Sequence, residues 1–130
     1  MINTLSIETR LLDDEILAVV LGGSLDGTTT EQFNKAIQDH LGQGRTKIII
    51  DCRNVHSISS FGIASLVGLQ TRLRRQGGEV KLAALFGVAA EAIQIVGLGR
   101  LLNIYGDLEL ARQSFHEPPP RPQQSIMLLP

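Results

Sequence analysis

Hydrophobic residues change their spacing several times along the chain, and each spacing predicts a different element. Residues 4–10 alternate apolar and polar side chains, which is typical of a half-buried strand. Residues 15–23 form a more apolar strand that should pair with it in antiparallel fashion, because Asp13 and Asp14 favour a turn between them. Residues 46–52 form a continuous apolar run, as expected for a strand that is covered on both faces.

Between and after these strands, the apolar residues recur three and four positions apart, which predicts helices. The first helix has an apolar face made of Phe33, Ala36, Ile37 and Leu41. Thr28 with Glu31 predicts a capping box at its start. A second helix is expected from about Phe61 to Gln76, with arginines in its last turn that suit the negative end of its dipole.

The remaining third of the chain repeats the alternation of strand and helix. Residues 79–85 and 101–106 are predicted strands, and residues 107–115 a last helix. The short helix between the two strands is expected to turn four residues inward, Val88, Ala92, Ile93 and Val96, with Gly97 as its cap. The order predicts an α/β fold: a mixed sheet of four to five strands with about four helices packed mainly on one side.

The 130 residues suit one domain, which we place at residues 1–116. All 5 prolines follow Glu117, so residues 117–130 are expected to be a disordered Pro-rich tail. A net charge of −1 gives no electrostatic case for nucleic acid or an anionic membrane. Cys52 is the single cysteine and cannot form an internal disulfide, and neither a signal peptide nor a membrane span is recognised. We therefore expect a cytoplasmic protein.

The start of the second helix carries two adjacent serines with different expected roles. If Ser59 is the N-cap, Ile58 and Ile63 occupy the two positions of a hydrophobic staple, whereas a cap at Ser60 loses that pair. Ser59 is therefore the better cap, with its hydroxyl accepting from an amide two or three residues on. Ser60 is left at the first helical position, pointing toward solvent. Gly62 is expected to keep this surface open to another molecule, although two serines and a glycine can simply start a helix.

Other chemistry has weaker support. His40, His56 and His116 are dispersed and match no metal-site spacing, so neither a metal nor a cofactor is expected. His56 lies near the serines, but a solvated loop histidine is the simpler interpretation than a catalytic base. Residues 22–28 are glycine-rich but lack the lysine of a phosphate loop. The run "RLRR" is most simply a solvated helix end, with partner contact as the alternative.

Taken in order, the motifs resemble the STAS domain of bacterial anti-sigma factor antagonists. An apolar strand ending in Asp is followed by a short loop and by Ile-Ser-Ser-x-Gly-Ile. Upstream, "LGGSLDGTTTEQF" resembles that family's second strand and first helix, with Asp26 at the usual acidic position. Downstream, "QGGEVKLAAL" and "IVGLGRLLNIYGDLELA" resemble its last two strand–helix units. The similarity covers roughly Leu5 to Phe115.

The resemblance implies a STAS-type fold and a non-enzymatic switch. Members of that family capture a serine kinase that doubles as an anti-sigma factor, which frees the sigma factor, and phosphorylation of one serine breaks the complex. Carried onto this sequence, the acceptor is Ser60, with Ser59 as second choice. The implied partner-binding residues are Asp26, Ser59, Ser60, Phe61 and Gly62. A monomer or weak dimer is expected.

Two positions depart from the family pattern, and other functions stay open. Ser59 stands where many members carry Asp, and Phe61 stands where many carry Ser or Ala, which can alter partner choice. The alternative with the same fold is a constitutive, unphosphorylated STAS subunit of a lipid-transport or signalling assembly. A third class is an enzyme or nucleotide binder, which a bound nucleotide would favour.

Overall fold

A computed structural model describes residues 4–95 and 101–116. The expected cap at Gly97, the inward position of Val96 and the Pro-rich tail at residues 117–130 lie outside the described residues. The elements run β1 Leu5–Leu12, β2 Ile16–Leu25, α1 Thr30–Leu41, β3 Lys47–Ile58, α2 Ser60–Arg75, β4 Glu79–Ala83, α3 Gly87–Ile95, β5 Asn103–Tyr105 and α4 Leu108–His116. The predicted α/β order is therefore confirmed.

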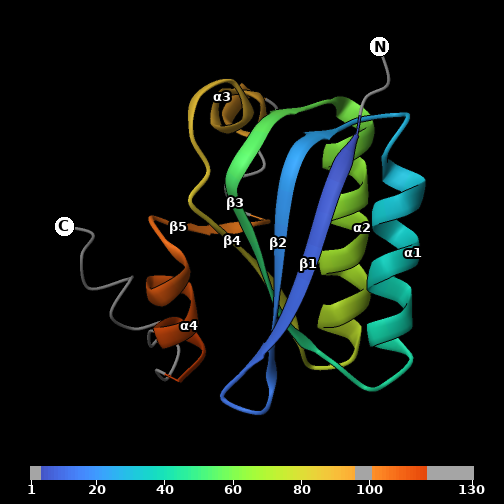
Figure 1. The fold of residues 1–130 in the computed structure, drawn as a ribbon. Coiled ribbons are helices and arrows are strands. Elements are labelled where there is room, and N and C mark those ends of the chain that lie inside the picture. Colours follow the sequence, from blue (N-terminus) through green and yellow to red (C-terminus); the bar gives the residue numbers. More distant parts are fainter. Residues whose placement is uncertain (1–3, 96–100, 117–130) are drawn as a thin grey trace, which may run out of the picture.

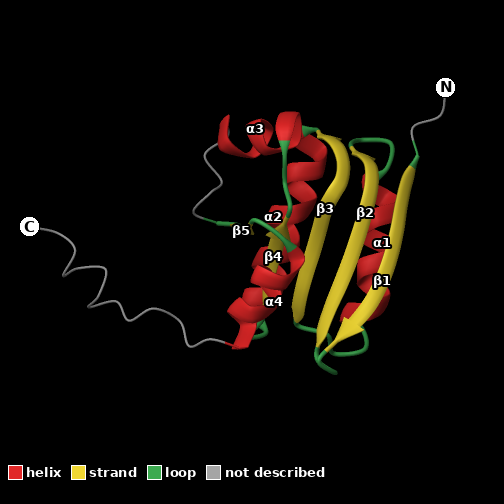
Figure 2. Cartoon of the chain, turned by 60° about the vertical axis from the view of Figure 1, so that its left-hand side comes forward, coloured by secondary structure: helices red, strands yellow, loops and turns green. Residues whose placement is uncertain are grey.

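The five strands form one sheet in the order β1-β2-β3-β4-β5 (Figure 1). β1 pairs antiparallel with β2 through a tight turn, in which Asp13 and Asp14 both adopt positive φ angles. The other three pairs are parallel. Parallel neighbours need crossovers, and α1, α2 and α3 supply them (Figure 2).

Alternate residues of β3 belong to two different hydrophobic cores. Ile48 and Ile50 pack in the main core with buried residues of α1, α2 and α3. Ile49, between them, faces the other way and packs in a smaller core with Ala111 of α4. Three helices thus cover one face of the sheet and α4 covers part of the other, which confirms a fold with its helices mainly on one side. Because both faces are covered, the strand carries a continuous apolar run.

A buried lysine holds α4 against the second face. Lys81 of β4 is 6% exposed, and its Nζ lies 2.7 Å from Ser114 Oγ. The same ammonium lies 4.1 Å from the centroid of the Phe115 ring and 5.4 Å from that of Tyr105. Aromatic faces and a hydroxyl therefore replace the water that the buried charge has lost.

Three local expectations are wrong. α1 begins after Thr29 rather than Thr28, and no side chain caps it, because the Thr28 hydroxyl donates to Asp26 instead of forming a box with Glu31. In α3, Ile93 is buried and Ala92 packs against the main core as expected, but Val88 is 65% exposed and Ala89 is buried instead, four residues before Ile93 on the face that meets the sheet.

The third correction concerns the end of β3. The strand continues to Ile58, so His56 lies on a strand and not in a loop. Its pairing with β2 shifts register between Val20 and Gly22 and again between Gly23 and Ser24. Gly23 has a φ of +100°, which a side chain would rarely adopt, so glycine permits this irregular extension.

Candidate functional site

β2 and β3 end together, and this brings the loop at Asp26 to the start of α2. Leu25 pairs with Ile58 at the last position of both strands. The amide of Ser59 then donates to the carbonyl of Leu25 over 2.9 Å. Asp26 follows Leu25 directly, so Asp26 and Ser60 lie at the same edge of the sheet, where carboxyl ends of parallel strands gather. We call Asp26 together with residues 59–62 the Ser60 edge.

The two serines at this edge have different environments. Ser59 is half-buried and has extended backbone angles, and its Oγ accepts from the amide of Gly62 at 3.4 Å. The prediction that Ser59 is the N-cap is therefore confirmed. Ile58 and Ile63, the expected staple, are both buried in the main core. Ser60 is exposed, and its hydroxyl has no hydrogen-bond partner within the described residues.

The loop that carries Asp26 is held by its own hydrogen bonds. Asp26 Oδ1 accepts from the hydroxyl of Thr28 at 2.7 Å and from its amide at 2.8 Å. These bonds hold the pKa of Asp26 below its ordinary value, so the carboxylate is charged at neutral pH. The Thr29 hydroxyl donates to the carbonyl of Ser24 at 2.8 Å and accepts from the amide of Asp26 at 3.0 Å. The negative charge is thus fixed in place before any partner binds.

The structure shows why position 62 is a glycine, which the sequence alone did not reveal. It is buried, and a Cβ at this position would lie 2.4 Å from the carbonyl oxygen of Leu25 and 2.9 Å from Cγ2 of Ile58. Glycine is needed here because α2 begins directly against the end of β2. Gly62 therefore fixes the approach of the helix to the sheet, and its role is not to keep a surface open.

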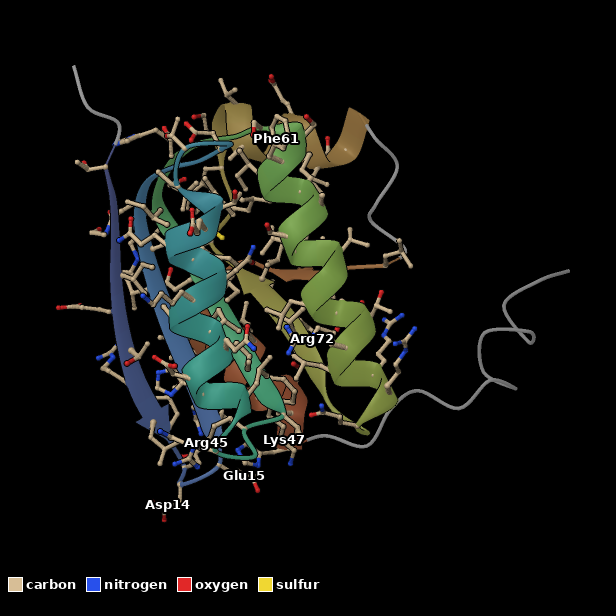
Figure 3. The ribbon with its side chains drawn as sticks, turned by 90° about the vertical axis from the view of Figure 1, so that its right-hand side faces the viewer. Asp14, Glu15, Arg45, Lys47, Phe61 and Arg72 are labelled. Atoms are coloured by element: carbon tan, nitrogen blue, oxygen red, sulfur yellow. The ribbon has the colours of Figure 1, made fainter. Side chains whose placement is uncertain are left out.

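Phe61 is the exposed hydrophobic residue of the edge. It stands at the top of α2 beside the Asp26 loop (Figure 3), and it is 66% exposed. A Cβ at Gly27 would lie 3.3 Å from Cδ2 of Phe61, so the ring rests over that glycine. Phe86 and Val88 at the start of α3 are also largely exposed, at 60% and 65%. Sequence periodicity assigned Val88 to the core and did not single out Phe86.

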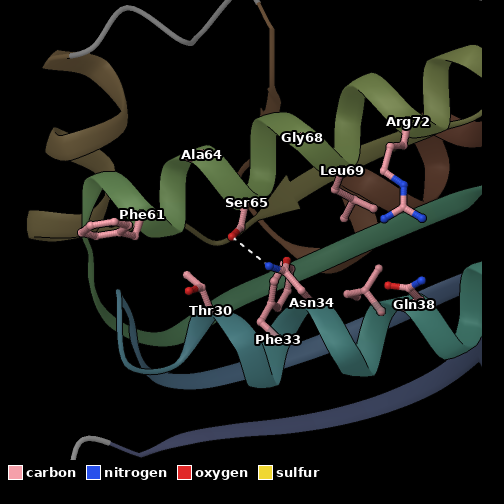
Figure 4. A pocket seen from close by; sticks show the side chains of 11 residues that line it. Thr30, Phe33, Asn34, Gln38, Phe61, Ala64, Ser65, Gly68, Leu69 and Arg72 are labelled. Carbon is pink, nitrogen blue, oxygen red and sulfur yellow. Dashed lines mark hydrogen bonds between the residues drawn. The ribbon is translucent and has the colours of Figure 1, made fainter.

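A groove descends from Phe61 between α1 and α2 (Figure 4). It has a volume of about 530 Å³. Phe33, Ile37, Gln38, Thr30 and Asn34 line it from α1, and Phe61, Ala64, Ser65, Gly68, Leu69 and Arg72 line it from α2. Sequence analysis missed this groove, although the four-residue spacing of Ala64, Gly68 and Arg72 was a signal for a shared helix face.

Two further candidate groups from the sequence, the Cys52 thiol and the His56 ring, both lie on β3. Burial raises the pKa of the Cys52 thiol to about 12, so it stays protonated and unreactive near neutral pH. His56 is exposed, and no hydrogen bond joins it to either serine in the described part of the chain. Residues 4–95 and 101–116 contain no group of three or more His, Cys, Asp or Glu side chains placed to hold a metal ion. None of the helices in those ranges is long and apolar enough to cross a bilayer.

Comparison with known proteins gives a consistent result. The family model of the STAS domain matches residues 9–111. BtrV of Bordetella bronchiseptica, which carries the provisional name of an anti-sigma factor antagonist, is 24% identical over 108 residues that cover 83% of this chain and 93% of BtrV.

Solved structures with the same fold include two antagonists. An anti-sigma factor antagonist from Mycobacterium paratuberculosis has a TM-score of 0.80 at 19% identity, covering 88% of this chain and 96% of its own. The anti-sigma factor antagonist SpoIIAA in its unphosphorylated form has a TM-score of 0.73 at 21% identity, covering 88% and 100%. The Bacillus cell fate determinant SpoIIAA has also been solved in its phosphorylated form, with a TM-score of 0.66 at 23% identity, covering 85% and 99%. At these identities the likeness establishes the fold.

Proposed function

The chain belongs to the STAS domain family, and we propose that it acts there as an anti-sigma factor antagonist. In this proposal the unphosphorylated chain captures an anti-sigma factor serine kinase through the Ser60 edge and so frees a sigma factor. Phosphorylation of Ser60 breaks the complex. The chain itself performs no catalysis and acts in the cytoplasm by presenting a surface whose charge changes.

The observation that carries the proposal is the difference between the environments of the Ser59 and Ser60 hydroxyls. Ser59 is half-buried and its Oγ accepts from the amide of Gly62, so that hydroxyl serves the fold. Ser60 stands one residue on, exposed, with no partner for its hydroxyl in the described residues. An acceptor serine must enter the active site of a kinase, and Ser60 can do so without loss of a cap. This supports Ser60 over Ser59 as the switching residue.

A phosphate on Ser60 would change binding without unfolding the domain. α2 has no acidic residue in its first turn, so the positive end of its dipole is uncompensated by a side chain. An anion of about −1.5 to −2 charges is favourable at that position for the helix itself. In a complex the same charge would be desolvated against the kinase, and it would lie at the same edge as the fixed charge of Asp26. The penalty would therefore fall on the complex.

Mapping the phosphate after incubation with the kinase and ATP tests the proposal. The probe is each purified serine-kinase anti-sigma factor from the same genome, with the wild-type chain and with Ser60→Ala and Ser59→Ala. We expect one phosphate, on Ser60, which Ser60→Ala abolishes and Ser59→Ala retains. Phosphate on Ser59 would contradict the assignment. No phosphate from any of the kinases would also contradict it and would favour the constitutive STAS subunit.

A further inference from the structure

The α1–α2 groove has an apolar floor and is bridged at one point by a side-chain hydrogen bond between the two helices. Phe33, Ile37 and Leu69 are buried at its base, and Asn34 reaches across to Ser65 with 3.4 Å between Nδ2 and Oγ (Figure 4). The groove has a volume of about 530 Å³ and is open to solvent. It runs between two helices that lie side by side (Figure 3), a shape that accepts the side-chain ridge of a third helix.

The α2 wall of this groove is shaped for close approach. Ser60, Ala64, Gly68 and Arg72 are spaced by four residues and all are exposed, so they form one ridge of the helix. Gly68 has no unusual φ, and a Cβ built there would meet nothing within 4 Å. Nothing inside the domain therefore requires glycine at this exposed helical position, where glycine is disfavoured. Small side chains on a ridge allow another backbone to come near.

The two ends of the groove have different chemistry. Phe61 at the upper end offers an exposed aromatic ring, the type of residue that anchors protein interfaces. Arg72 lines the lower end, and it takes part in no ion pair within the described residues. An exposed arginine without a partner favours an acidic group on a molecule that lies along the groove.

From these features we propose that the groove receives an α-helix of the kinase. That helix places small or apolar residues against Gly68 and Ala64, covers Phe61 at one end, and directs a carboxylate to Arg72 at the other. The inference rests on the proposed function, because it extends the same interface from the Ser60 edge down the length of α2. Helix-in-groove binding commonly uses apolar anchors at intervals of three and four residues.

The position of Ser60 gives this arrangement a regulatory consequence. Ser60 heads the ridge that continues through Ala64 and Gly68 to Arg72. A phosphate there would stand where the incoming helix first contacts the ridge, beside Phe61. It would therefore oppose the contact at the end of the groove where Phe61 lies.

Filling the groove with Gly68→Leu tests the proposal. The dissociation constant of the purified kinase that binds the wild-type chain most tightly would be measured by calorimetry. We expect Gly68→Leu to weaken binding by at least about tenfold, which corresponds to about 1.4 kcal/mol. The melting temperature should be unchanged or raised, since leucine is the better helix former and meets no internal atom. Gln113→Leu on α4 is the control: it adds the same side chain at an exposed helical position on the other face of the sheet and should leave binding unchanged.

Charge reversal tests the lower end of the groove. Arg72→Glu should weaken kinase binding about tenfold and reduce its dependence on salt, because it removes one cation that pairs with the kinase. Arg75→Glu makes the same charge change on an exposed residue of α2 that does not line the groove, and it should have a much smaller effect. Equal effects of the two variants would show general steering by charge and would overturn the assignment of Arg72.

The outcomes separate this inference from the function on which it rests. If Ser60→Asp abolishes binding while folded Gly68→Leu binds like the wild-type chain, the groove proposal is wrong and the switch stands. If no kinase binds the wild-type chain, both fail. Tight binding of ATP or GTP to the isolated chain that is lost in Gly68→Leu would assign the groove to a nucleotide and would overturn the helix.

Discussion

At the scale of single residues, the two serines differ in what their hydroxyls bind. The Ser59 hydroxyl accepts from a backbone amide that has no partner inside the helix, whereas the Ser60 hydroxyl is exposed. This difference followed from the sequence, because only one choice of cap places Ile58 and Ile63 in staple positions. A local rule was sufficient since the cap involves residues within one turn of each other.

The roles of Ser59 and Ser60 can be compared by measuring how much each alanine substitution changes the free energy of unfolding. Ser59→Ala removes the acceptor for the Gly62 amide and should lower the free energy of unfolding by about 0.5–2 kcal/mol, toward the smaller value because the bond is 3.4 Å long. Ser60→Ala should change it by less than about 0.5 kcal/mol, because alanine is favourable in the first helical turn. Urea unfolding of both variants beside the wild-type chain measures the difference. Equal losses would show that Ser60 shares the capping role.

Two glycines of α2 provide a second comparison. Gly62→Ala forces a Cβ to 2.4 Å from the Leu25 carbonyl, so the start of α2 must shift from β2, with an expected loss of about 1–3 kcal/mol. Gly68→Ala places its Cβ in open space and should stabilise the chain by about 1 kcal/mol. Thermal or urea unfolding of the two variants beside the wild-type chain measures the expected loss of stability for one and the expected gain for the other. A Gly62→Ala chain as stable as the wild type would contradict the close packing of α2 on β2.

No sequence rule could have separated these glycines. Both lie in the same predicted helix, and each looks equally unfavourable there. The difference arises from β2, which the fold brings to Gly62 from more than 30 residues away in the chain. The same distance explains why Gly62 was assigned to an open surface.

At the scale of elements, prediction succeeded for the type and order of the elements and for the buried face of α1, and it failed at the start of α1, at the end of β3 and at Val88 of α3. The buried run at residues 46–52 was assigned correctly, but its continuation to Ile58 depends on irregular pairing with β2 that no local pattern shows. In α3 the inward position of Ile93 was predicted correctly, but that of Val88 was wrong, because neighbouring apolar residues fit the same spacing and packing on the sheet turned Ala89 inward instead. The groove was missed because it needs the relative placement of α1 and α2.

The ion pairs that join α4 to the β1–β2 turn are predicted to weaken at low pH. Asp13, in the β1–β2 turn, lies 2.7 Å from Arg112 and 2.9 Å from His116, and these contacts lower its pKa from the ordinary 3.8. A carboxylate with a depressed pKa in the folded chain stabilises it above pH 3.8, and the contribution is lost as pH falls through the lower folded value. Because Asp13 and His116 are exposed and Arg112 is only half-buried, the effect should be small but directional.

Melting temperatures at pH 6 and pH 3 would measure how much the Asp13 carboxylate stabilises the chain. Asp13→Asn should lower the melting temperature at pH 6 and lower it less at pH 3, because the contribution of the wild-type carboxylate decreases once the pH falls below 3.8. Asp14→Asn is the matched control, since Asp14 is in the same turn but takes part in no ion pair among the described residues. A difference between Asp13→Asn and the wild-type chain that persists undiminished at pH 3 would show that the ion pair is not its source.

At the scale of the whole molecule, the exposed ridge of α2 lies outside both hydrophobic cores. The smaller core and buried Lys81 lie between one face of the sheet and α4, and the main core lies between the other face and the helices that include the two walls of the groove. The strand ends bring the fixed charge of Asp26 to the helix that presents Ser60 and Phe61. A change on the exposed ridge of α2 can therefore alter binding while the cores remain intact.

The central claim is that a negative charge on Ser60 breaks a complex without unfolding the chain. The most direct measurement is the affinity of the purified kinase for the wild-type chain and for Ser60→Asp, with the melting temperature of each measured in the same buffer. Our account predicts that Ser60→Asp weakens binding by about tenfold or more while its melting temperature stays equal or rises, because an anion suits the start of α2. Undiminished binding by a folded Ser60→Asp chain that carries the charge in the same place would contradict it.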